Sequence, residues 1–380
     1  MAEEILGLTF DTKKDGWNTS AGFIKREIAM PVLDEQKNPK DAFCVVLKIT
    51  YAGVCGTDRG IFKREVFKNL IESSLENEQK TTRILGHEFL GEVVLLGSKA
   101  NEQRSQKISI GTAVSGDSHI TCGQCYQCKI GQNNVCTNEL ILGISIDGIF
   151  AQYVKLPAKN LFAVDLNLIR PQIASIMDPF GNAMHAVSKF QPKDQTVAVF
   201  GTGAIGLFAI AILKHFGAKK IIAIDVNLEN LKLAEKMGAD HSLLADESIA
   251  KNILSLTENI GIDVCMEMAG PLSSVLNSFA ATRRGGQVVL FGLKDGDFTI
   301  PKFSQIITKG LTIYGVIGRR IFETWEASHN LLCDKSNGVQ EKIWEVILKK
   351  GEGTIIDFNS YNKEDFEKSM KEYPKIIFKL

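Results

Sequence analysis

The chain has 380 residues, 44% of them hydrophobic, and its 44 basic residues balance its 44 acidic ones. This length predicts about two domains, and the zero net charge argues against a nucleic-acid or membrane-surface partner, since either favours a basic surplus. No apolar run reaches the ~18 residues of a transmembrane helix, and the first residues lack the basic and apolar regions of a signal peptide. We therefore expect a cytoplasmic protein with no membrane partner.

The first half of the chain predicts a mostly β domain. β-Branched and apolar residues form runs at 42–51, 93–96, 113–115 and 151–156. Runs of this length and composition are typical of strands. The polar segment among them, residues 62–82, predicts a surface helix or loop.

The stretch Gly86-His87-Glu88 carries candidate metal donors. Cys55 lies upstream of it, in the run Cys-Gly-Thr-Asp, and Asp178 lies downstream. A thiolate, an imidazole and a carboxylate from separate segments are the donors that an open tetrahedral Zn²⁺ site uses, so we predict a catalytic zinc site here. The alternative is a buried core histidine beside a helix-capping glutamate, but that leaves the other motifs of the chain unexplained.

The most specific short signal is a cluster of four cysteines, Cys122, Cys125, Cys128 and Cys136. Four thiolates close a tetrahedral zinc shell and leave no open position, so we predict a structural zinc site. Chance clustering of reduced cysteines is the alternative, and the strict three-residue spacing argues against it. We expect small core residues at the remaining cysteines, Cys44, Cys265 and Cys333.

Strand-like and helical runs alternate in the second half of the chain. The expected strands are residues 196–200, 221–225, 263–268, 287–291 and 311–317, with a weaker one at 241–244. The expected helices are residues 204–216, 228–237, 272–281 and 302–309. This alternation predicts βαβ units and a doubly wound parallel sheet, so the fold class is α/β.

The C-terminal residues depart from this alternation. A helical stretch begins at residue 322, and residues 355–358 and 376–380 look like strands. We therefore place a mostly β domain at residues 1–175, a parallel-sheet domain at 176–314, and a C-terminal segment at 315–380 that returns to the first domain.

Residues 197–206 predict a dinucleotide-binding turn, because an apolar strand runs into Gly201, Gly203 and Gly206 and then into a helix. The first glycine makes the turn, the second admits a pyrophosphate and the third lets helix and strand pack closely. The helix N-terminus attracts that phosphate. Asp225 ends the next strand, where an acidic residue suits the ribose hydroxyls of NAD and repels a 2′-phosphate. The alternative is a glycine-rich turn with no ligand.

Together these motifs resemble those of the zinc-dependent medium-chain dehydrogenase/reductase superfamily over nearly the whole chain. Within it, the segments most similar to the threonine dehydrogenases are residues 115–123, 178–185, 263–270 and 318–325. The resemblance implies a GroES-like catalytic domain with a structural zinc lobe, joined to a Rossmann NAD-binding domain. It also implies a homo-oligomer, either a tetramer or a dimer.

The resemblance gives roles to individual residues near the zinc. The catalytic metal would be held by Cys55, His87 and Glu88. Asp178 would be an acidic fourth ligand or a carboxylate near the metal. Thr57 would be the hydroxyl that passes the substrate proton onward.

Other roles concern the substrate and the cofactor. His119 would lie near the substrate, with a surface-loop histidine as the alternative. Arg319 or Arg320 is a candidate partner for a substrate carboxylate, with a plain surface charge as the alternative. The NAD site would be formed by Gly201, Gly203, Ile205, Gly206, Asp225, Asn230, Phe291, Gly292, Leu293, Val316 and Ile317.

Three features depart from the family pattern. Gly60 stands where family members carry the histidine that ends the proton relay. The segment between Cys55 and His87 is longer than usual, and Asn230 replaces an arginine near the adenosine ribose.

The reaction that the resemblance implies is hydride transfer from a secondary alcohol to NAD, with L-threonine giving 2-amino-3-oxobutanoate. The run Cys-Gly-Thr-Asp-Arg is similar to that of archaeal glucose dehydrogenases, so a sugar or polyol dehydrogenase on the same scaffold is the first alternative. A non-catalytic NAD- and zinc-binding interaction protein is the second, and the intact set of zinc donors argues against it.

Overall fold

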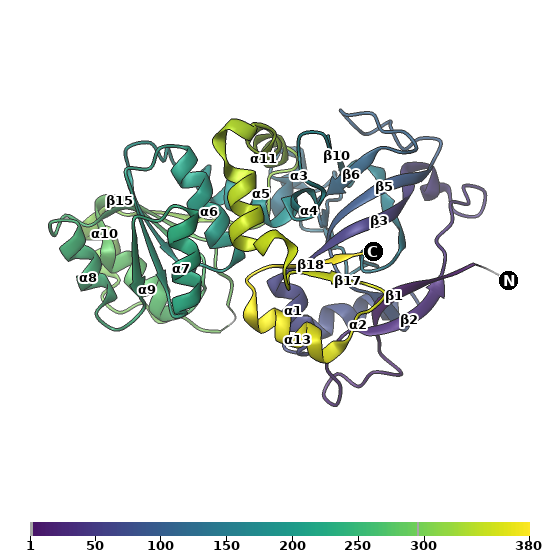
Figure 1. The fold of residues 1–380 in the computed structure, drawn as a ribbon, viewed down its shortest axis with the longest axis horizontal. Coiled ribbons are helices and arrows are strands. Elements are labelled where there is room, and N and C mark those ends of the chain that lie inside the picture. Colours follow the sequence, from purple (N-terminus) through teal and green to yellow (C-terminus); the bar gives the residue numbers. More distant parts are fainter. Residues whose placement is uncertain (1–2, 295) are drawn as a thin grey trace. The chain divides into compact units, whose positions relative to one another are not determined.

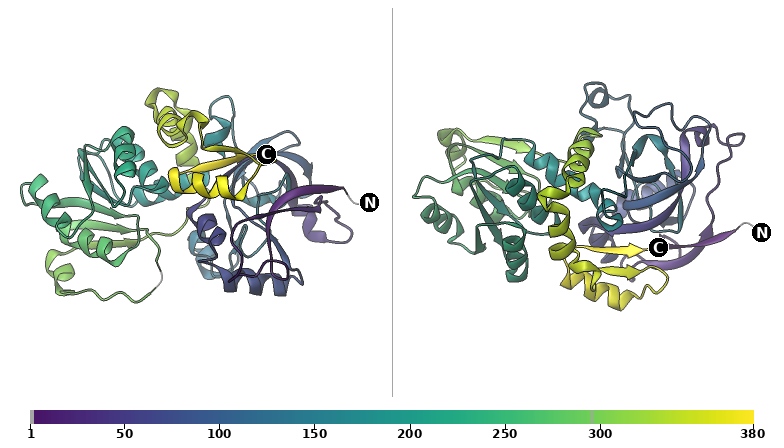
Figure 2. Two further views of the ribbon diagram at one scale, coloured as in Figure 1. Left: turned by 60° about the horizontal axis from the view of Figure 1, so that its bottom comes forward. Right: turned by 45° about the horizontal axis from the view of Figure 1, so that its top comes forward.

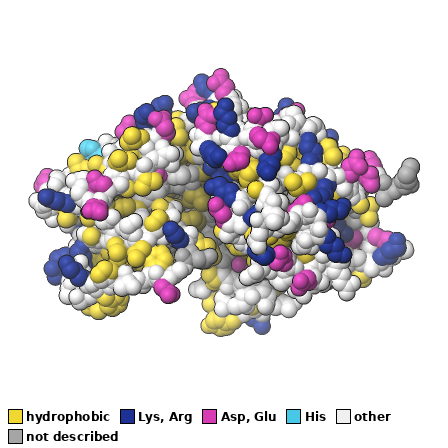
Figure 3. Space-filling model, turned by 90° about the horizontal axis from the view of Figure 1, so that it is seen from below, with side chains coloured by type: hydrophobic (Ala, Val, Ile, Leu, Met, Phe, Trp, Pro, Cys, Tyr) yellow, Lys and Arg dark blue, Asp and Glu magenta, His cyan; other side chains and the backbone are white. Residues whose placement is uncertain are grey.

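The computed structural model describes residues 3–294 and 296–380, and the chain divides into two compact units (Figure 1). Unit 1 comprises Met1–Asp178, Arg320–Cys333 and Gly351–Leu380, and unit 2 comprises Pro179–Arg319 and Asp334–Lys350. None of the described helices is both long enough and apolar enough to cross a membrane. Acidic and basic side chains are interspersed on the face seen in Figure 3.

The main sheet of unit 1 combines strands from both ends of the chain (Figures 1 and 2). Its described strands, in spatial order, are β10 (Leu161–Ala163), β6 (Ala113–Gly116), β5 (Glu88–Leu96), β3 (Cys44–Val54), β18 (Ile376–Lys379) and β17 (Ile355–Asp357), and β9 (Tyr153–Pro157) also pairs with β3. β18 runs antiparallel to β3 with Ile376 opposite Val54. The last strand of the chain therefore completes a sheet that the first half begins.

Smaller elements surround this sheet. The strands are β2 (Ile24–Ala29), β1 (Glu4–Asp11) and β4 (Thr82–Ile84) in one sheet, and β7 (His119–Ile120) and β8 (Leu140–Ile141) in another. The helices are α1 (Gly56–Phe62), α2 (Lys68–Asn77), α3 (Tyr126–Lys129), α4 (Pro171–Ala174), α11 (Glu323–Cys333) and α13 (Lys363–Glu372). Helix α5 (Met177–Val187) begins in unit 1 and continues into unit 2.

The polar segment predicted as a surface helix or loop contains helix α2, and a buried arginine anchors it. Arg83 on β4 is fully buried, and its guanidinium donates to Glu78 Oε1 at 2.8 Å and to Ser74 Oγ at 2.9 Å. It also pairs with Asp147 at 3.2 Å. Pairing with acceptors offsets the cost of burying a guanidinium, so this network ties α2 to the strands beside it.

Unit 2 is built on a six-stranded parallel sheet, counted over the described residues. Its order is β13 (His241–Leu244), β12 (Lys220–Asp225), β11 (Thr196–Phe200), β14 (Ile262–Glu267), β15 (Thr282–Leu290) and β16 (Thr312–Gly315). The helices are α6 (Ala204–His215), α7 (Leu228–Met237), α8 (Ile249–Leu256), α9 (Leu272–Ala281) and α10 (Ser304–Lys309). The strand order reverses direction between β11 and β14, as in a doubly wound Rossmann fold, which confirms the predicted fold class.

The helices of this sheet cover it in two sets. Helices α6 and α7 pack against each other, and α8 packs against α9. Ile253 of α8 and Phe279 of α9 join Ala198, Phe200 and Ile222 of the strands in one buried cluster. Apolar runs in β11, β12 and β14 are thus explained by burial on both faces of the sheet.

The predicted return of the whole segment 315–380 to the first domain is wrong in two parts. Residues 315–319 remain in unit 2. Asp334–Lys350 also belongs to unit 2, where α12 (Val339–Lys342) and a π-helical turn at Ile343–Ile347 pack on α6 and α7. Ile343 and Ile347 are fully buried there. Their burial against α6 and α7 holds this stretch in unit 2.

Candidate active site

Three of the predicted zinc donors lie together in unit 1. The ligand atoms of Cys55, His87 and Glu88 are all within 4.8 Å of one another. Gly86 has a φ of +84° and turns the chain into β5, so that His87 and Glu88 face this group. A side chain at Gly86 would overlap the ring of Phe150, so the turn requires glycine.

Asp58 holds two of these donors in place. It is buried, its Oδ2 accepts from the Cys55 backbone N–H at 2.8 Å, and its Oδ1 lies 3.5 Å from His87 Nδ1. At 3.5 Å this second contact is between charges and is not a hydrogen bond. It places a carboxylate beside one imidazole nitrogen and leaves the other nitrogen for a metal. The sequence analysis missed this role, although Asp58 stands three residues after Cys55 at the start of α1.

The electrostatics of the group suit a divalent cation. Burial opposes the charged imidazole, but Asp58 and Cys55 outweigh it and raise the pKa of His87 well above its usual value. The negative charge of Asp58 and Cys55 that raises this pKa also favours a divalent cation, which must displace the proton from the imidazole. Glu88 adds a fully buried carboxylate whose Oε1 has no hydrogen-bond partner among the described residues. A buried polar atom of this kind needs a partner, and zinc fits it.

The other oxygen of Glu88 contacts the ammonium of Lys375, which is itself 2% exposed. Burial raises the pKa of Glu88, and the Lys375 cation offsets this in part. Sequence reasoning missed Lys375, since a single lysine before an apolar strand carries no motif.

Asp178 is not part of the donor group. The group of atoms within 4.8 Å comprises Cys55, His87 and Glu88 alone among the described residues. Asp178 is buried at the start of α5, and its Oδ2 accepts from the backbone N–H of Ser118 at 3.1 Å. Its predicted role as a fourth ligand is therefore not supported, and only the weaker form, a carboxylate near the metal, agrees with this geometry.

Thr57 lies in the first turn of α1, two residues after Cys55, and its side chain is partly exposed. Gly60 lies one turn further along the same helix. A Cβ atom at Gly60 would be 2.6 Å from Cγ2 of Val66. Packing of Val66 therefore explains why this position carries glycine instead of a larger residue.

His119 is held by a carboxylate. Its Nδ1 lies 2.7 Å from Glu139 Oε2, and its backbone N–H donates to Asp117 Oδ1 at 2.9 Å. Asp117 in turn accepts from the indole N–H of Trp325 at 2.8 Å. The structure thus holds His119 in place at the start of β7, and its place near a substrate stays a prediction.

The two candidate arginines have other partners. Arg319 is 3% exposed and donates to Asn182 Oδ1 at 3.0 Å within unit 2. Arg320 forms an exposed ion pair with Glu323 at 3.2 Å. These contacts favour a structural role for Arg319 and a surface charge for Arg320.

The four cysteines of the lobe converge as predicted. The sulfur atoms of Cys122, Cys125, Cys128 and Cys136 are within 4.8 Å of one another, and all eight cysteines are free of disulfides. Cys122 Sγ accepts from the backbone N–H of Cys125 at 3.3 Å. The backbone N–H of Cys128 lowers the pKa of Cys125 to about 5, while desolvation raises that of Cys128 to about 12. A closed set of four sulfur donors fits a structural zinc ion, which allows all four thiols to ionise.

The glycine-rich turn has the geometry that a pyrophosphate requires. Gly201 has a φ of +91°, and Gly203 caps α6 without a side-chain hydrogen bond, so the first N–H groups of that helix are available. A Cβ atom at Gly206 would overlap the carbonyl oxygen of Gly201. Asp225 Oδ2 accepts from the backbone N–H of Thr202 at 2.7 Å and from its hydroxyl at 2.9 Å. Asp225 therefore also braces the turn.

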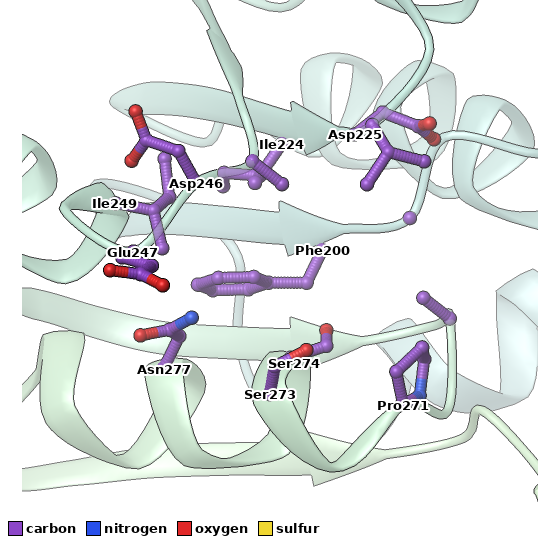
Figure 4. Close-up of a pocket in the computed structure, with 14 residues that line it drawn as sticks. Phe200, Ile224, Asp225, Asp246, Glu247, Ile249, Pro271, Ser273, Ser274 and Asn277 are labelled. Atoms are coloured by element: carbon purple, nitrogen blue, oxygen red, sulfur yellow. The ribbon is translucent and has the colours of Figure 1, made fainter.

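A cavity of about 360 Å³ opens beside this turn at the carboxyl ends of β11 and β12 (Figure 4). Phe200 lies across its floor, and α9 supplies Ser274 and Asn277. The remaining lining residues labelled in the figure are Ile224, Asp225, Asp246, Glu247, Ile249, Pro271 and Ser273. Ligands of doubly wound sheets bind at the carboxyl ends of the strands near the switch point, so this cavity fits the adenosine half of a dinucleotide.

Of the predicted cofactor residues, Gly201 and Asp225 line this cavity. The others do not: Gly203, Ile205, Gly206, Asn230, Phe291, Gly292, Leu293, Val316 and Ile317. The acidic pair Asp246 and Glu247 was missed, since it follows the weak strand β13 and belongs to no motif. The predicted residues outside the cavity keep their roles as predictions.

Comparisons with known proteins agree with this site. Residues 41–166 match the alcohol dehydrogenase GroES-like domain, and residues 204–333 match the zinc-binding dehydrogenase family. The L-threonine 3-dehydrogenase of Bacillus subtilis is 36% identical over 84% of this chain and 86% of its own. That of Burkholderia vietnamiensis is 38% identical over 74% of this chain and 78% of its own.

Among solved structures, an alcohol dehydrogenase of Thermus sp. ATN1 superposes with a TM-score of 0.80 at 23% identity, covering 98% of this chain and 99% of its own. At this identity the likeness shows the fold. The relatives that match most of the chain and the two zinc-compatible donor groups establish the family and the reaction class. The chain therefore belongs to the zinc-dependent medium-chain dehydrogenases and is an alcohol oxidoreductase whose cofactors are Zn²⁺ and NAD.

Proposed function

We propose that this dehydrogenase oxidises the secondary hydroxyl of L-threonine to 2-amino-3-oxobutanoate with NAD as hydride acceptor, and that it works in the cytoplasm. The observation that supports L-threonine as the substrate is the 36% identity with an L-threonine 3-dehydrogenase across 84% of this chain. The donor group of Cys55, His87 and Glu88 supports the chemistry, because three protein donors leave a fourth tetrahedral position for the substrate oxygen.

The chain's own residues position the reactants and move the proton. When bound, zinc lowers the pKa of an alcohol and NAD accepts the hydride. Asp58 accepts a hydrogen bond from the Cys55 backbone and lies beside the His87 ring, so it helps to position both donors. Thr57, next to these donors on α1, accepts the proton that leaves the alcohol and passes it outward. The amide of Ser118 holds Asp178 nearby.

A steady-state screen tests this function. L-Threonine, L-serine, glucose, sorbitol and butanediol would each be assayed with NAD and with NADP. We expect the highest kcat/KM with L-threonine and NAD. Turnover of glucose or sorbitol with none of threonine would select the sugar or polyol alternative, and cofactor binding without turnover of any alcohol would select the interaction protein.

Metal analysis should find two zinc ions per chain, because the two donor groups use different residues. We expect His87→Ala to hold one zinc and to lose activity, while Cys44→Ala, which lies in neither group, keeps two. A chelator should remove the open-site zinc and the activity first, since the four-sulfur site is closed. One zinc or fewer in wild-type protein made with ample metal would contradict the assignment.

NAD should be preferred over NADP, because a 2′-phosphate would meet the carboxylates of Asp225, Asp246 and Glu247 around one cavity. Asp225→Ser should improve kcat/KM for NADP by about tenfold, or ~1.4 kcal/mol, and NAD should still be preferred because the other two carboxylates remain. Asp225→Asn is the matched control for charge, since its amide oxygen can still accept from Thr202. Equal efficiency of the wild type with both cofactors would refute the prediction.

We propose in addition that the enzyme is a homo-oligomer, a dimer or a tetramer. β16 pairs with β15 alone among the described strands, and Ile313 on it and Phe303 and Ile307 before it are exposed. An open apolar edge strand favours pairing with another chain, and a twofold axis lets the same strand pair with itself. Light scattering should show a dimer or tetramer that Ile313→Lys dissociates and Ile110→Lys, at an exposed site of unit 1, does not. A monomeric wild type would overturn this proposal.

A further inference from the structure

Lys375 is a buried cation in direct contact with a proposed zinc donor. Its side chain is 2% exposed, and its ammonium contacts Glu88 Oε2 and donates to the carbonyl oxygen of Val54 at 3.0 Å. Val54 directly precedes Cys55. A buried ammonium is costly unless it is paired, and these two acceptors pair it beside two of the three donors.

Two independent anchors hold the backbone around Lys375. Arg59, on the same helix as Thr57, donates to the carbonyl oxygens of Met370, Tyr373 and Pro374 at 2.6, 2.8 and 3.0 Å. On the other side, Ile376 starts the β18 pairing with β3. The backbone at Lys375 is therefore held on both sides, and this keeps its side chain next to Glu88.

The carboxylate of Glu88 is fixed on the other side as well. Glu88 lies opposite Gly53 in the β3–β5 register. A Cβ atom at Gly53 would overlap Glu88 Oε2, so only glycine leaves room for the carboxylate above β3. The two oxygens of Glu88 then have different surroundings: Lys375 occupies Oε2, while Oε1 is buried without a partner among the described residues.

We propose that Lys375 is a positioning residue that makes Glu88 a one-oxygen zinc ligand. An open catalytic site needs three protein donors and one vacant position. A carboxylate that bound through both oxygens would fill that position. Lys375 prevents this by holding Oε2, so that Cys55, His87 and Glu88 Oε1 supply three donors. The proposal rests on the zinc part of the proposed function and not on the choice of substrate.

Cobalt substitution tests the proposal without any turnover. The open-site zinc would be removed with a chelator and replaced by Co²⁺, whose visible absorption is intense when it has four ligands and weaker when it has five or six. We expect wild type and Lys375→Arg to show the intense spectrum. Lys375→Met should show a clearly weaker one, because both oxygens of Glu88 then bind the metal.

Lys375→Gln is the second variant, since its amide tolerates burial beside Val54 but is shorter and carries no charge. We expect it to weaken the spectrum as Lys375→Met does. Spectra of both folded variants that coincide with wild type would overturn the proposal. Failure of both to fold, judged by circular dichroism, would make Lys375 a structural cation and would equally overturn it. A poor rate with threonine alongside the expected spectra would instead count against the proposed substrate.

Discussion

Replacing Thr57 by valine should lower kcat/KM for the alcohol by roughly 10²–10⁴-fold, the usual contribution of a positioned proton-transfer group. Valine keeps the shape of threonine and removes its hydroxyl. Because Thr57 lies in the first turn of α1, two residues after Cys55, the hydroxyl is the first protein group along α1 that can take a proton from the substrate. Steady-state kinetics with L-threonine and NAD would measure the loss.

Two controls separate this effect from damage to the site. Thr57→Ser keeps a hydroxyl and should retain most of the rate, and zinc content and NAD affinity of Thr57→Val should match those of wild type. Near-native turnover by Thr57→Val would show that the proton leaves by another route. Asp178 would then be the next group to replace, as a candidate base beside the metal.

The end of the relay differs from the family pattern at Gly60. A histidine there would buffer the proton with an unperturbed pKa of about 6.5, whereas glycine leaves the path to water or to the ribose hydroxyls of the nicotinamide. We expect Gly60→His to change the pH profile of oxidation more than its maximal rate. Its side chain must displace Val66, so Gly60→Ala is the control for packing and should leave the profile unchanged.

Alanine at Gly206 should destabilise unit 2 and abolish NAD binding. The added methyl group would overlap the carbonyl oxygen of Gly201, which is backbone and cannot rotate away. Forcing an atom into packed structure costs about 1–3 kcal/mol, and the displaced turn would no longer fit a pyrophosphate. Thermal unfolding and NAD titration by fluorescence would measure both effects.

Gly203→Ala is the matched variant, because a Cβ atom there has no neighbour within 4 Å. We expect native stability together with NAD affinity lowered by about 10–100-fold, or ~1.4–2.7 kcal/mol, since the methyl group would lie where the pyrophosphate approaches the backbone. Native NAD affinity in Gly203→Ala would place the pyrophosphate elsewhere. Native stability in Gly206→Ala would show that the turn can shift.

Motifs within a few residues of one another could be predicted from the sequence. The cysteine lobe, the adjacent donors His87 and Glu88, and the glycine-rich turn all depend on local spacing, because a metal or a helix N-terminus fixes the distances between neighbours. Cys55 lies in a separate segment and was assigned from the Cys-Gly-Thr-Asp run that resembles the family motif. The parallel sheet could also be predicted, because the alternation of strands and helices is visible in short stretches of the sequence.

Contacts between distant segments could not be predicted in this way. Lys375 is 287 residues from Glu88, and the β18–β3 pairing and the hydrogen bonds of Arg59 to the preceding residues bring them together. The acidic residues of the nucleotide cavity lie after an edge strand with no motif, and the stretch at 334–350 joins unit 2 through the burial of Ile343 and Ile347. For Asp178 the sequence left open a fourth ligand or a carboxylate near the metal, because a motif does not show which group the carboxylate faces; the structure places it outside the donor group, on the N–H of Ser118.

The position of β18 also has a consequence for how the protein matures. Domains tend to fold from the N-terminus as the ribosome synthesises them, but the sheet of unit 1 lacks β17 and β18 until Ile355–Asp357 and Ile376–Lys379 emerge. Unit 2 has no such requirement beyond residue 350. The zinc centre of unit 1 can therefore form only after the segment that carries β17 and β18 has been made, and a chain cut before residue 351 would keep the segments of the nucleotide-binding unit and lack part of the sheet behind the zinc donors.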